Sequence, residues 1–272
     1  MLYSLIRAAY ARSPVNERLK RQWHQPWIGG GVGALLATVV GLIFFLLPPG
    51  KGLRDWSFDL PFLFKAEQQI SDAAIVYLDE KSYNELKQDP TRFDRALHAK
   101  LVRRLQQAGA KLVVFDVLFI DSSRGITAAE LDFAAAMKES RRVVLGAQYF
   151  EDTHLAASST SVWPPVDLFR EAAAGWGLVR VHRDTDFAAR RISPGTDQIP
   201  CMAWKAAELT GAQIAKQPEA RLTERWLNYY CREPFAAISY SDVVSEKPLP
   251  PGFSFKDKVV FEIGRASCRE RV

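Results

Sequence analysis

The stretch LVVFDVLF, residues 112–119, decides the fold class of this 272-residue chain. It is a continuous apolar run that only Asp116 interrupts, and such a run predicts a strand buried on both faces. The residues before it, Asp94–Ala108, carry apolar side chains at helical spacing and are followed by Gly109, which predicts a helix with Asp94 as its N-cap or as an acid in its first turn. A helix followed by a doubly buried strand is the repeating unit of a parallel sheet.

Strand and helix alternate on both sides of this unit. Short apolar runs predict further strands at Ala73–Leu78, Val143–Ala147, Gly177–Val181, Trp226–Tyr230 and Lys258–Phe261. Further helices are predicted over Ala128–Lys138, Val166–Ala174 and Met202–Thr210. Residues Asp184 to Pro194 depart from this order and suggest an irregular hairpin. Because helical crossovers join parallel strands, we predict an α/β fold with a mostly parallel, helix-flanked sheet.

An N-terminal transmembrane helix is predicted at Trp27–Leu47. The sequence WIGGGVGALLATVVGLIFFLL contains no charged side chain, and as a helix it would span roughly 30 Å, the thickness of a bilayer core. A buried core helix and a cleaved signal peptide are the alternatives. The run is longer than the usual apolar region of a signal peptide, and no small-x-small cleavage site follows it.

The charges on either side of this span predict its orientation. Residues 1–26 are basic, whereas the basic residues just after the span are balanced by Asp55 and Asp59. Short basic flanks stay in the cytoplasm, so we expect a cytoplasmic tail at 1–26 and a periplasmic or extracellular domain at 54–261, anchored in a bacterial inner membrane. The charged residues of the tail are Arg7, Arg12, Glu17, Arg18, Lys20 and Arg21.

The last eleven residues, Glu262–Val272, read EIGRASCRERV and resemble the translation of a sequencing adapter. We expect them to be foreign to the natural protein, with the native strand DKVVF interrupted at Phe261; a genuine basic terminus is the alternative. Without the two ends, the globular part is formally neutral, which argues against a nucleic-acid partner. Cys201 and Cys231 could form a disulfide in an oxidising space, or remain two small thiols.

A ligand site is predicted where strands end in acidic residues. Ligands of parallel sheets bind beyond the carboxyl ends of the strands. Asp116 lies within an apolar strand and must find a partner, which Arg95 or Lys111 could supply. The candidate ligand-binding residues are Asp79, Glu80, Arg95, Asp116 and Asp121. Such carboxylates could also hold Mg²⁺ or simply cap turns.

The sequence offers little support for an enzyme. The motifs G-x-x-x-x-G-K-[ST], G-x-S-x-G and H-E-x-x-H do not occur, so we expect neither catalytic residues nor a cofactor in this chain. His98 follows Leu97 on a predicted helix and is expected at the surface or its boundary rather than as a ligand.

The chain resembles the second type of CHASE domain, the cyclase- and histidine-kinase-associated sensory extracellular domains. The resemblance covers residues 54–261 and includes IVYLDEKSYNEL at 75–86, RALHAKLVRRLQQAGAKLVVFDVLF at 95–119, GWGLVRVHRDTDFAARRISP at 175–194, WLNYY at 226–230, ISYSDVV at 238–244 and FKDKVVF at 255–261. Two places depart from the family pattern. QDPTRF at 88–93 stands where a Trp-Pro-Trp-like turn is usual, and Cys231 with Arg232 stands where a glycine is usual.

The resemblance implies a bacterial sensor input domain that passes a signal to a cyclase, histidine kinase, Ser/Thr kinase or diguanylate cyclase output module. We expect the output module to be missing from this chain, an unknown extracytoplasmic ligand or protein as the signal, and a homodimer. It implies no particular binding residues. The competing hypothesis is a membrane-tethered periplasmic metal-dependent enzyme that uses the carboxylate cluster.

Overall fold

The computed structural model describes residues 26–46, 48–90, 93–120, 125–152, 159–231 and 233–264. The chain divides into two compact units, Met1–Lys65 and Ala66–Val272. The predicted tail, apart from Pro26, lies outside the described residues, as do Asp121 and the residues from 265 onward. Because the two units are separate bodies, each is described by itself.

The first unit contains two consecutive helices, α3 (Pro26–Leu46) and α4 (Pro48–Phe64). In α3, the segment Trp27–Leu46 is long and apolar enough to cross a membrane, and none of it is buried within the protein. The sequence predicts α3 to within one residue but does not predict α4. The Pro48-Pro49-Gly50 motif suggests a break, yet proline is tolerated in the first turn of a helix, where its missing N–H would have no partner.

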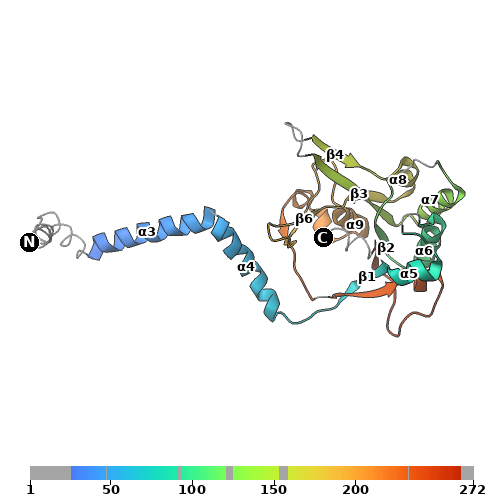
Figure 1. Ribbon diagram of the computed structural model, residues 1–272, viewed down its shortest axis with the longest axis horizontal. Coiled ribbons are helices and arrows are strands. Elements are labelled where there is room, and N and C mark those ends of the chain that lie inside the picture. Colours follow the sequence, from blue (N-terminus) through green and yellow to red (C-terminus); the bar gives the residue numbers. More distant parts are fainter. Residues whose placement is uncertain are drawn as a thin grey trace, which may run out of the picture. The chain divides into compact units, whose positions relative to one another are not determined.

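The second unit is built on a seven-stranded sheet (Figure 1). The order is β4-β3-β2-β10-β1-β9, and β5 also pairs with β3. All of the pairs are parallel except that of β3 with β4. The predicted mostly parallel α/β fold is therefore confirmed. The strands are β1 (Ile70–Leu78), β2 (Leu112–Leu118), β3 (Val143–Asp152), β4 (Ser159–Trp163), β5 (Gly175–Leu178), β9 (Phe235–Ser239) and β10 (Val259–Gly264).

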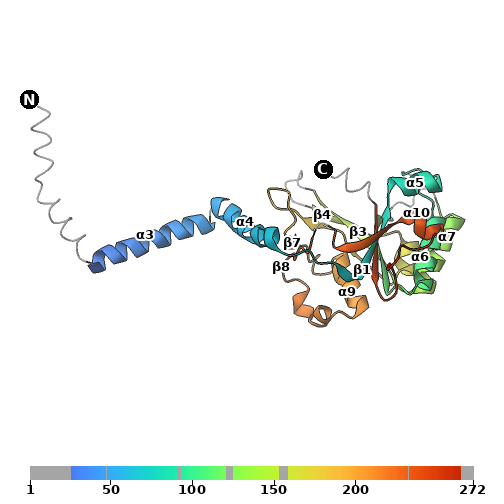
Figure 2. The same ribbon diagram turned by 90° about the horizontal axis from the view of Figure 1, so that it is seen from below.

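Helices cover both faces of this sheet (Figure 2). One face is covered by α5 (Glu80–Leu86), α6 (Arg95–Gln107), α7 (Ala128–Ser140), α8 (Asp167–Ala172) and α10 (Tyr240–Val244), and the other by α9 (Met202–Thr210). Because successive side chains of a strand point to opposite faces of the sheet, the core consists of two separate clusters. Val76 and Phe115 belong to the large cluster beneath α6 and α7, whereas Val114 and Val144 contact Ala206 of α9. The central strands are thus buried on both sides, as the apolar run at 112–119 requires.

A small antiparallel sheet, β6-β7-β8, stands beside the main one. Its strands are β6 (Val181–His182), β7 (Arg191–Ile192) and β8 (Arg225–Trp226). Ion pairs around the buried Asp184 and Arg190 hold the hairpin between β6 and β7. Arg190 pairs with Asp184 at 3.2 Å and with the exposed Asp186 at 2.6 Å, and Arg191 pairs with Asp184 at 2.8 Å. The predicted hairpin is confirmed. Two 3-10 turns, η1 (Gln213–Lys216) and η2 (Pro218–Ala220), follow α9.

Several predicted boundaries are wrong. The strand predicted at Trp226–Tyr230 ends at Trp226, and the one predicted at Gly177–Val181 divides into β5 and β6. The strand predicted at Lys258–Phe261 continues through Gly264. The short elements β4, β9, α5 and α10 are not predicted at all. Elements of five to seven residues carry too little periodicity to be recognised, and tertiary contacts decide where they form.

The continuation of β10 places Glu262 in the middle of the core. Its backbone pairs with Val76 on one side and Phe115 on the other, and its side chain is fully buried. Among the described residues neither carboxyl oxygen has a hydrogen-bond partner. Burial, and then the Asp116 carboxylate, raises the pKa of Glu262 to about 8. An unpartnered buried carboxyl is costly. The origin of residues 262–272 in an adapter stays a prediction, and an apolar residue would suit this position better.

We predict that Glu262→Ile stabilises the protein. Because the pKa of Glu262 in the folded state lies above its ordinary value of 4.5, folding takes up a proton. The stability of the wild type should therefore fall as pH rises from 4.5 through about 8, by up to about 1.4 kcal/mol per pH unit. Urea unfolding of the chain in detergent at pH 5 and pH 8 measures this slope.

The isosteric variant Glu262→Gln is the matched control. It should lose the slope between pH 5 and pH 8 but gain less stability than Glu262→Ile, because a polar group stays buried. Equal stability of wild type and Glu262→Ile at pH 8 would contradict the burial of this carboxyl group.

Candidate functional site

The predicted site residues belong to one edge of the main sheet, where the parallel strands β1, β2, β9 and β10 end. Asp79 and Glu80 follow β1 directly, and Asp116 lies near the end of β2. Arg95 begins α6, which packs over the same end of the core. Asp121 lies outside the described residues. The structure thus brings four of the five predicted residues to the carboxyl edge of the sheet.

Asp79 is the centre of a hydrogen-bonded junction rather than a free carboxylate. It caps α5, and its Oδ1 accepts hydrogen bonds from the Ser82 backbone N–H at 2.9 Å, the Ser82 hydroxyl at 2.7 Å and the Ser239 hydroxyl at 2.9 Å. Burial raises the pKa of Asp79, but the bonds from Ser82 and Ser239 outweigh it, so that the pKa lies below its ordinary value. An ionised carboxylate with three donors joins β1, α5 and the end of β9.

Serines extend this junction into the first turn of α10. The Ser82 hydroxyl accepts a hydrogen bond from the Ser241 backbone N–H at 3.1 Å, and the hydroxyls of Ser239 and Ser241 lie 3.2 Å apart. Ser82 and Ser241 are fully buried. Sequence reasoning does not single out these serines, although the ISYSDVV motif contains two of them. Their alternation around Tyr240 is the signal that could have pointed to them.

Alternating charges lie on the outer side of the same junction. Lys81 pairs with Asp242 at 2.7 Å, and Lys247 pairs with Glu85 at 2.8 Å and with Asp242 at 2.9 Å. These pairs join α5 to α10 and its following turn. Burial raises the pKa of Asp242, but the bonds and charges of Lys81 and Lys247 lower it by more. The pKa of Asp242 therefore lies below its ordinary value. Each exposed pair adds little stability, but together they reinforce the contact between the two short helices.

His98 of α6 is fully buried, which makes the prediction of a surface position wrong. Its Nδ1 lies 3.1 Å from the Tyr240 hydroxyl, and its ring contacts those of Phe93, Phe115 and Phe133 at centroid distances of 5.0 to 5.5 Å. Burial, and then the charge of Arg95, lowers the pKa of His98 to about 3. The imidazole is therefore neutral at physiological pH and serves as a core group that contacts the Tyr240 hydroxyl.

Arg95 is placed between this aromatic core and the sheet edge. Its guanidinium lies 4.7 Å from the centroid of the Phe119 ring, a cation–π distance. Its charge also influences Glu262 and Tyr240.

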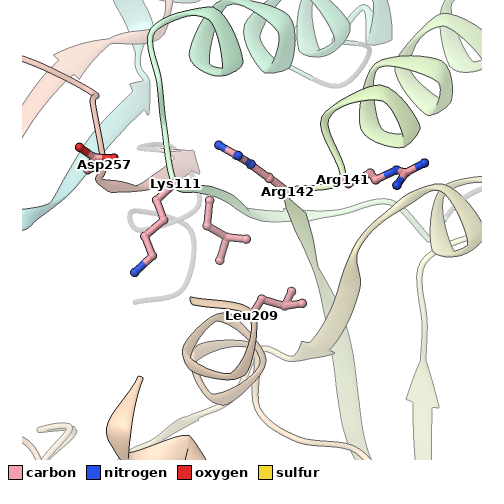
Figure 3. A pocket seen from close by; sticks show the side chains of 6 residues that line it. Lys111, Arg141, Arg142, Leu209 and Asp257 are labelled. Carbon is pink, nitrogen blue, oxygen red and sulfur yellow. The ribbon is translucent and has the colours of Figure 1, made fainter. Parts of the chain in front are cut away.

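Two hollows flank the sheet at opposite edges. The one nearer the predicted site has a volume of about 320 Å³ and is lined by Gly125, Ile126, Glu130, Val166, Asp167, Leu168 and Phe169. The other, of about 540 Å³, lies at the amino edge and is lined by Lys111, Leu112, Arg141, Arg142, Leu209 and Asp257 (Figure 3). Its arginines do not converge, since the side chains of Arg141 and Arg142 point in opposite directions (Figure 3). Arg141 is also the C-cap of α7, where a cation complements the helix dipole.

The described residues contain no group of three or more His, Cys, Asp or Glu side chains that could hold a metal ion. The carboxylate cluster of the enzyme hypothesis is therefore not assembled within these ranges. Asp79 Oδ1 is already engaged by Ser82 and Ser239.

Comparison with protein families completes the description of this site. Residues 34–266 match the CHASE2 domain. The chain belongs to the CHASE2 family. CHASE2 domains are extracellular sensory domains of signalling proteins and are not catalytic. The match begins inside α3 and runs through β10, so it includes the Asp79 junction and the aromatic core around His98. Comparisons with curated proteins and with solved structures found no match.

The CHASE2 domain holds its two described cysteines apart, as free thiols, so the disulfide considered from the sequence is not formed. The Sγ of Cys201 accepts a hydrogen bond from the Trp204 backbone N–H and caps α9. The thiol of Cys231 donates to the Gln68 carbonyl at 3.6 Å, on the segment that leads into β1. Each sulfur thus has a different local role.

We predict that Asp79→Ala destabilises the CHASE2 domain by roughly 1–3 kcal/mol, because it removes a helix cap and leaves Ser82 and Ser239 without their acceptor. Glu80→Ala is the matched control: this neighbour is exposed, and its loss should cost a few tenths of a kcal/mol. Urea unfolding of the chain in detergent measures both. Equal effects of the two variants would mean that the junction does not support the fold.

Proposed function

We propose that this chain is the membrane-anchored input part of a bacterial signal-transduction protein. One observation carries the proposal: the CHASE2 match begins inside an apolar helix of 20 residues, none of which is buried, and continues through the domain after it. Such a helix is stable when lipid covers it, because its backbone polar groups are satisfied internally. The domain is then the sensor, and α3 is the anchor that connects it to the cell.

The proposed topology puts the N-terminus in the cytoplasm and the CHASE2 domain in the periplasm. The support is the basic excess in residues 1–26 compared with the balanced charges after α3. The CHASE2 assignment agrees, because these domains are extracellular. The membrane in this proposal is the bacterial inner membrane.

The signal is proposed to bind at the carboxyl edge of the sheet, near Asp79, Glu80, Arg95, Asp116 and Asp121. The hollow lined by Gly125 and Val166, of about 320 Å³, is a space that a small ligand could enter, and Arg95 supplies a positive charge near the end of β2. A ligand can shift the protein between two states only if it binds them with different affinity. The Asp79 junction joins β1, β9, α5 and α10, so it is an element that such a ligand would bias.

We further propose that two chains pair in the membrane and that the natural protein carries a cyclase or kinase output module. The G-x-x-x-G formed by Gly29 and Gly33 at the start of α3 would permit close contact between two spans. Pairing provides a route by which a change in the exterior domain reaches the cytoplasm.

The topology is tested with alkaline phosphatase, which is active only outside the cytoplasm. A fusion after residue 60 should be active, because α3 would carry the enzyme across the membrane. A fusion after residue 22, before the span, should be inactive and serves as the control. Activity of the second fusion and not of the first would reverse the proposed orientation.

The sensor assignment is tested by sequencing the natural gene beyond the codon for Phe261. We expect further membrane spans followed by a cyclase or kinase module. A natural frame that stops shortly after Phe261 would contradict the proposal of an input domain for a covalently attached output.

A further inference from the structure

Helix α4 carries an apolar stripe that is exposed within its own unit. Leu53, Trp56, Leu63 and Phe64 are 54%, 60%, 76% and 83% exposed. With Leu60 they recur at intervals of three and four residues, which places all five on one side of the helix, in a stripe about 100° wide. A stripe of this size on a water-exposed helix is unfavourable, because each large apolar side chain left in water forgoes roughly 1.5–3 kcal/mol of burial.

The opposite side of α4 is charged. At 100° per residue, the five charged positions lie together on the half of the helix that faces away from the stripe. Between them, the half-buried rings of Phe58 and Phe62 pack against each other at 5.2 Å. The charges are mixed in sign, with three cations and two anions. The charged residues are Lys51, Arg54, Asp55, Asp59 and Lys65.

The position of α4 in the chain identifies what covers the stripe. Helix α3 ends at Leu46, and α4 begins at Pro48, so a single residue separates them. Pro48 and Pro49 have no N–H and cannot continue the hydrogen-bond ladder of α3, which allows the chain to change direction there. If α3 crosses the bilayer, the first turn of α4 must stand at the bilayer surface.

We propose that α4 lies in the outer interface of the bilayer that α3 crosses, with its apolar stripe among the upper parts of the acyl chains. The inference rests on the proposed function, because it needs α3 to span the membrane. Trp, Phe and Leu on one face and charges on the other are typical of interfacial helices, and Trp56 suits the headgroup level. Because the charged face is mixed, apolar burial rather than attraction to anionic lipid holds the helix, and zwitterionic phosphatidylcholine suffices.

A second copy of the chain is the rival occupant of the stripe. Leu53, Trp56, Leu60 and Leu63 also have the spacing of a coiled-coil seam. Two features favour lipid. The stripe spans fewer than two heptads, whereas a coiled coil needs three or four. Pro61 lies inside the helix, where it removes a backbone hydrogen bond and disturbs the regular geometry that a seam requires.

An interfacial α4 would couple the sensor to its span. Only residues 65–69 separate α4 from β1, and that link is held by the domain: Gln69 donates to the Glu233 carbonyl at 3.0 Å, and the Ile70 N–H donates to the Pro234 carbonyl at 2.7 Å. A shift of β1 would therefore change the depth or tilt of α4, and with it the position of α3.

Site-directed spin labelling of the full chain in phosphatidylcholine vesicles tests the inference. The cysteines at 201, 231 and 268 are first replaced by serine, and one cysteine is then introduced at each position from 51 to 65. We expect accessibility to O₂ to peak, and accessibility to a water-soluble nickel complex to fall, at Leu53, Trp56, Leu60 and Leu63. The opposite pattern is expected at Arg54 and Asp59; Asp55 is left out because it is 7% exposed. A label at Val39 of α3 reports whether the span itself is in lipid.

The outcomes separate the two proposals. A label at Val39 that is open to nickel would refute the membrane span, and with it the proposed function. A lipid-embedded Val39 with nickel-accessible stripe positions would overturn only the interfacial helix. Spin–spin broadening at the stripe that disappears on dilution with unlabelled chain would assign the stripe to a second copy, which also overturns the inference.

Two charge variants provide a matched pair. With a label at Leu63, Trp56→Asp should raise nickel accessibility several-fold, because a carboxylate in the stripe draws α4 out of the acyl region. Lys51→Asp puts the same side chain on the charged face and should leave it unchanged. Equal effects of the two variants would mean that the stripe does not hold the helix at the membrane.

Discussion

The insertion of β10 between β1 and β2 is the constraint on which the rest of the domain depends. It is the last of the described strands but lies centrally in the sheet, paired on both sides. Every inner strand needs hydrogen-bond partners along both edges, so β1 and β2 cannot be satisfied until β10 is in place. The core beneath α6 and α7 therefore depends on contacts between residues more than 140 positions apart, and a polar side chain within β10, such as Glu262, affects the whole core.

The same topology is relevant to the proposed transfer of a signal from the CHASE2 domain to the membrane span. The strand that follows α4 and the last described strand lie side by side and parallel, and both end at the edge where the Asp79 junction forms. A change at that edge acts on both strands at once. The junction is built from the ionised Asp79 carboxylate and three serines, which are joined by hydrogen bonds, and from ion pairs such as that of Lys81 with Asp242. It is suited to holding two short helices in register rather than to chemistry.

Sequence reasoning succeeded where a signal is local and long. The helix predicted at Asp94–Ala108 and the strand at 112–119 match α6 and β2, and Asp94 caps the helix through the Ala96 N–H. It failed where the outcome depends on distant residues. His98 reads as a boundary position on its own helix, but Tyr240, from another part of the chain, buries it. Helix α4 was not predicted because Pro48 and Pro49 suggest a break, although proline is also tolerated in the first turn of a helix.

By itself, the sequence determined the fold class, the apolar helix α3 and the family resemblance that the CHASE2 match confirms, because periodicity, length and motif order are properties of contiguous residues. The tertiary structure alone decided the strand order, the burial of His98 and Glu262, the separate roles of the cysteines and the meeting of Asp79 with Ser239. Each of these depends on which residues the crossover connections bring together. Pairing between segments that are far apart in the sequence leaves no periodic pattern in either segment.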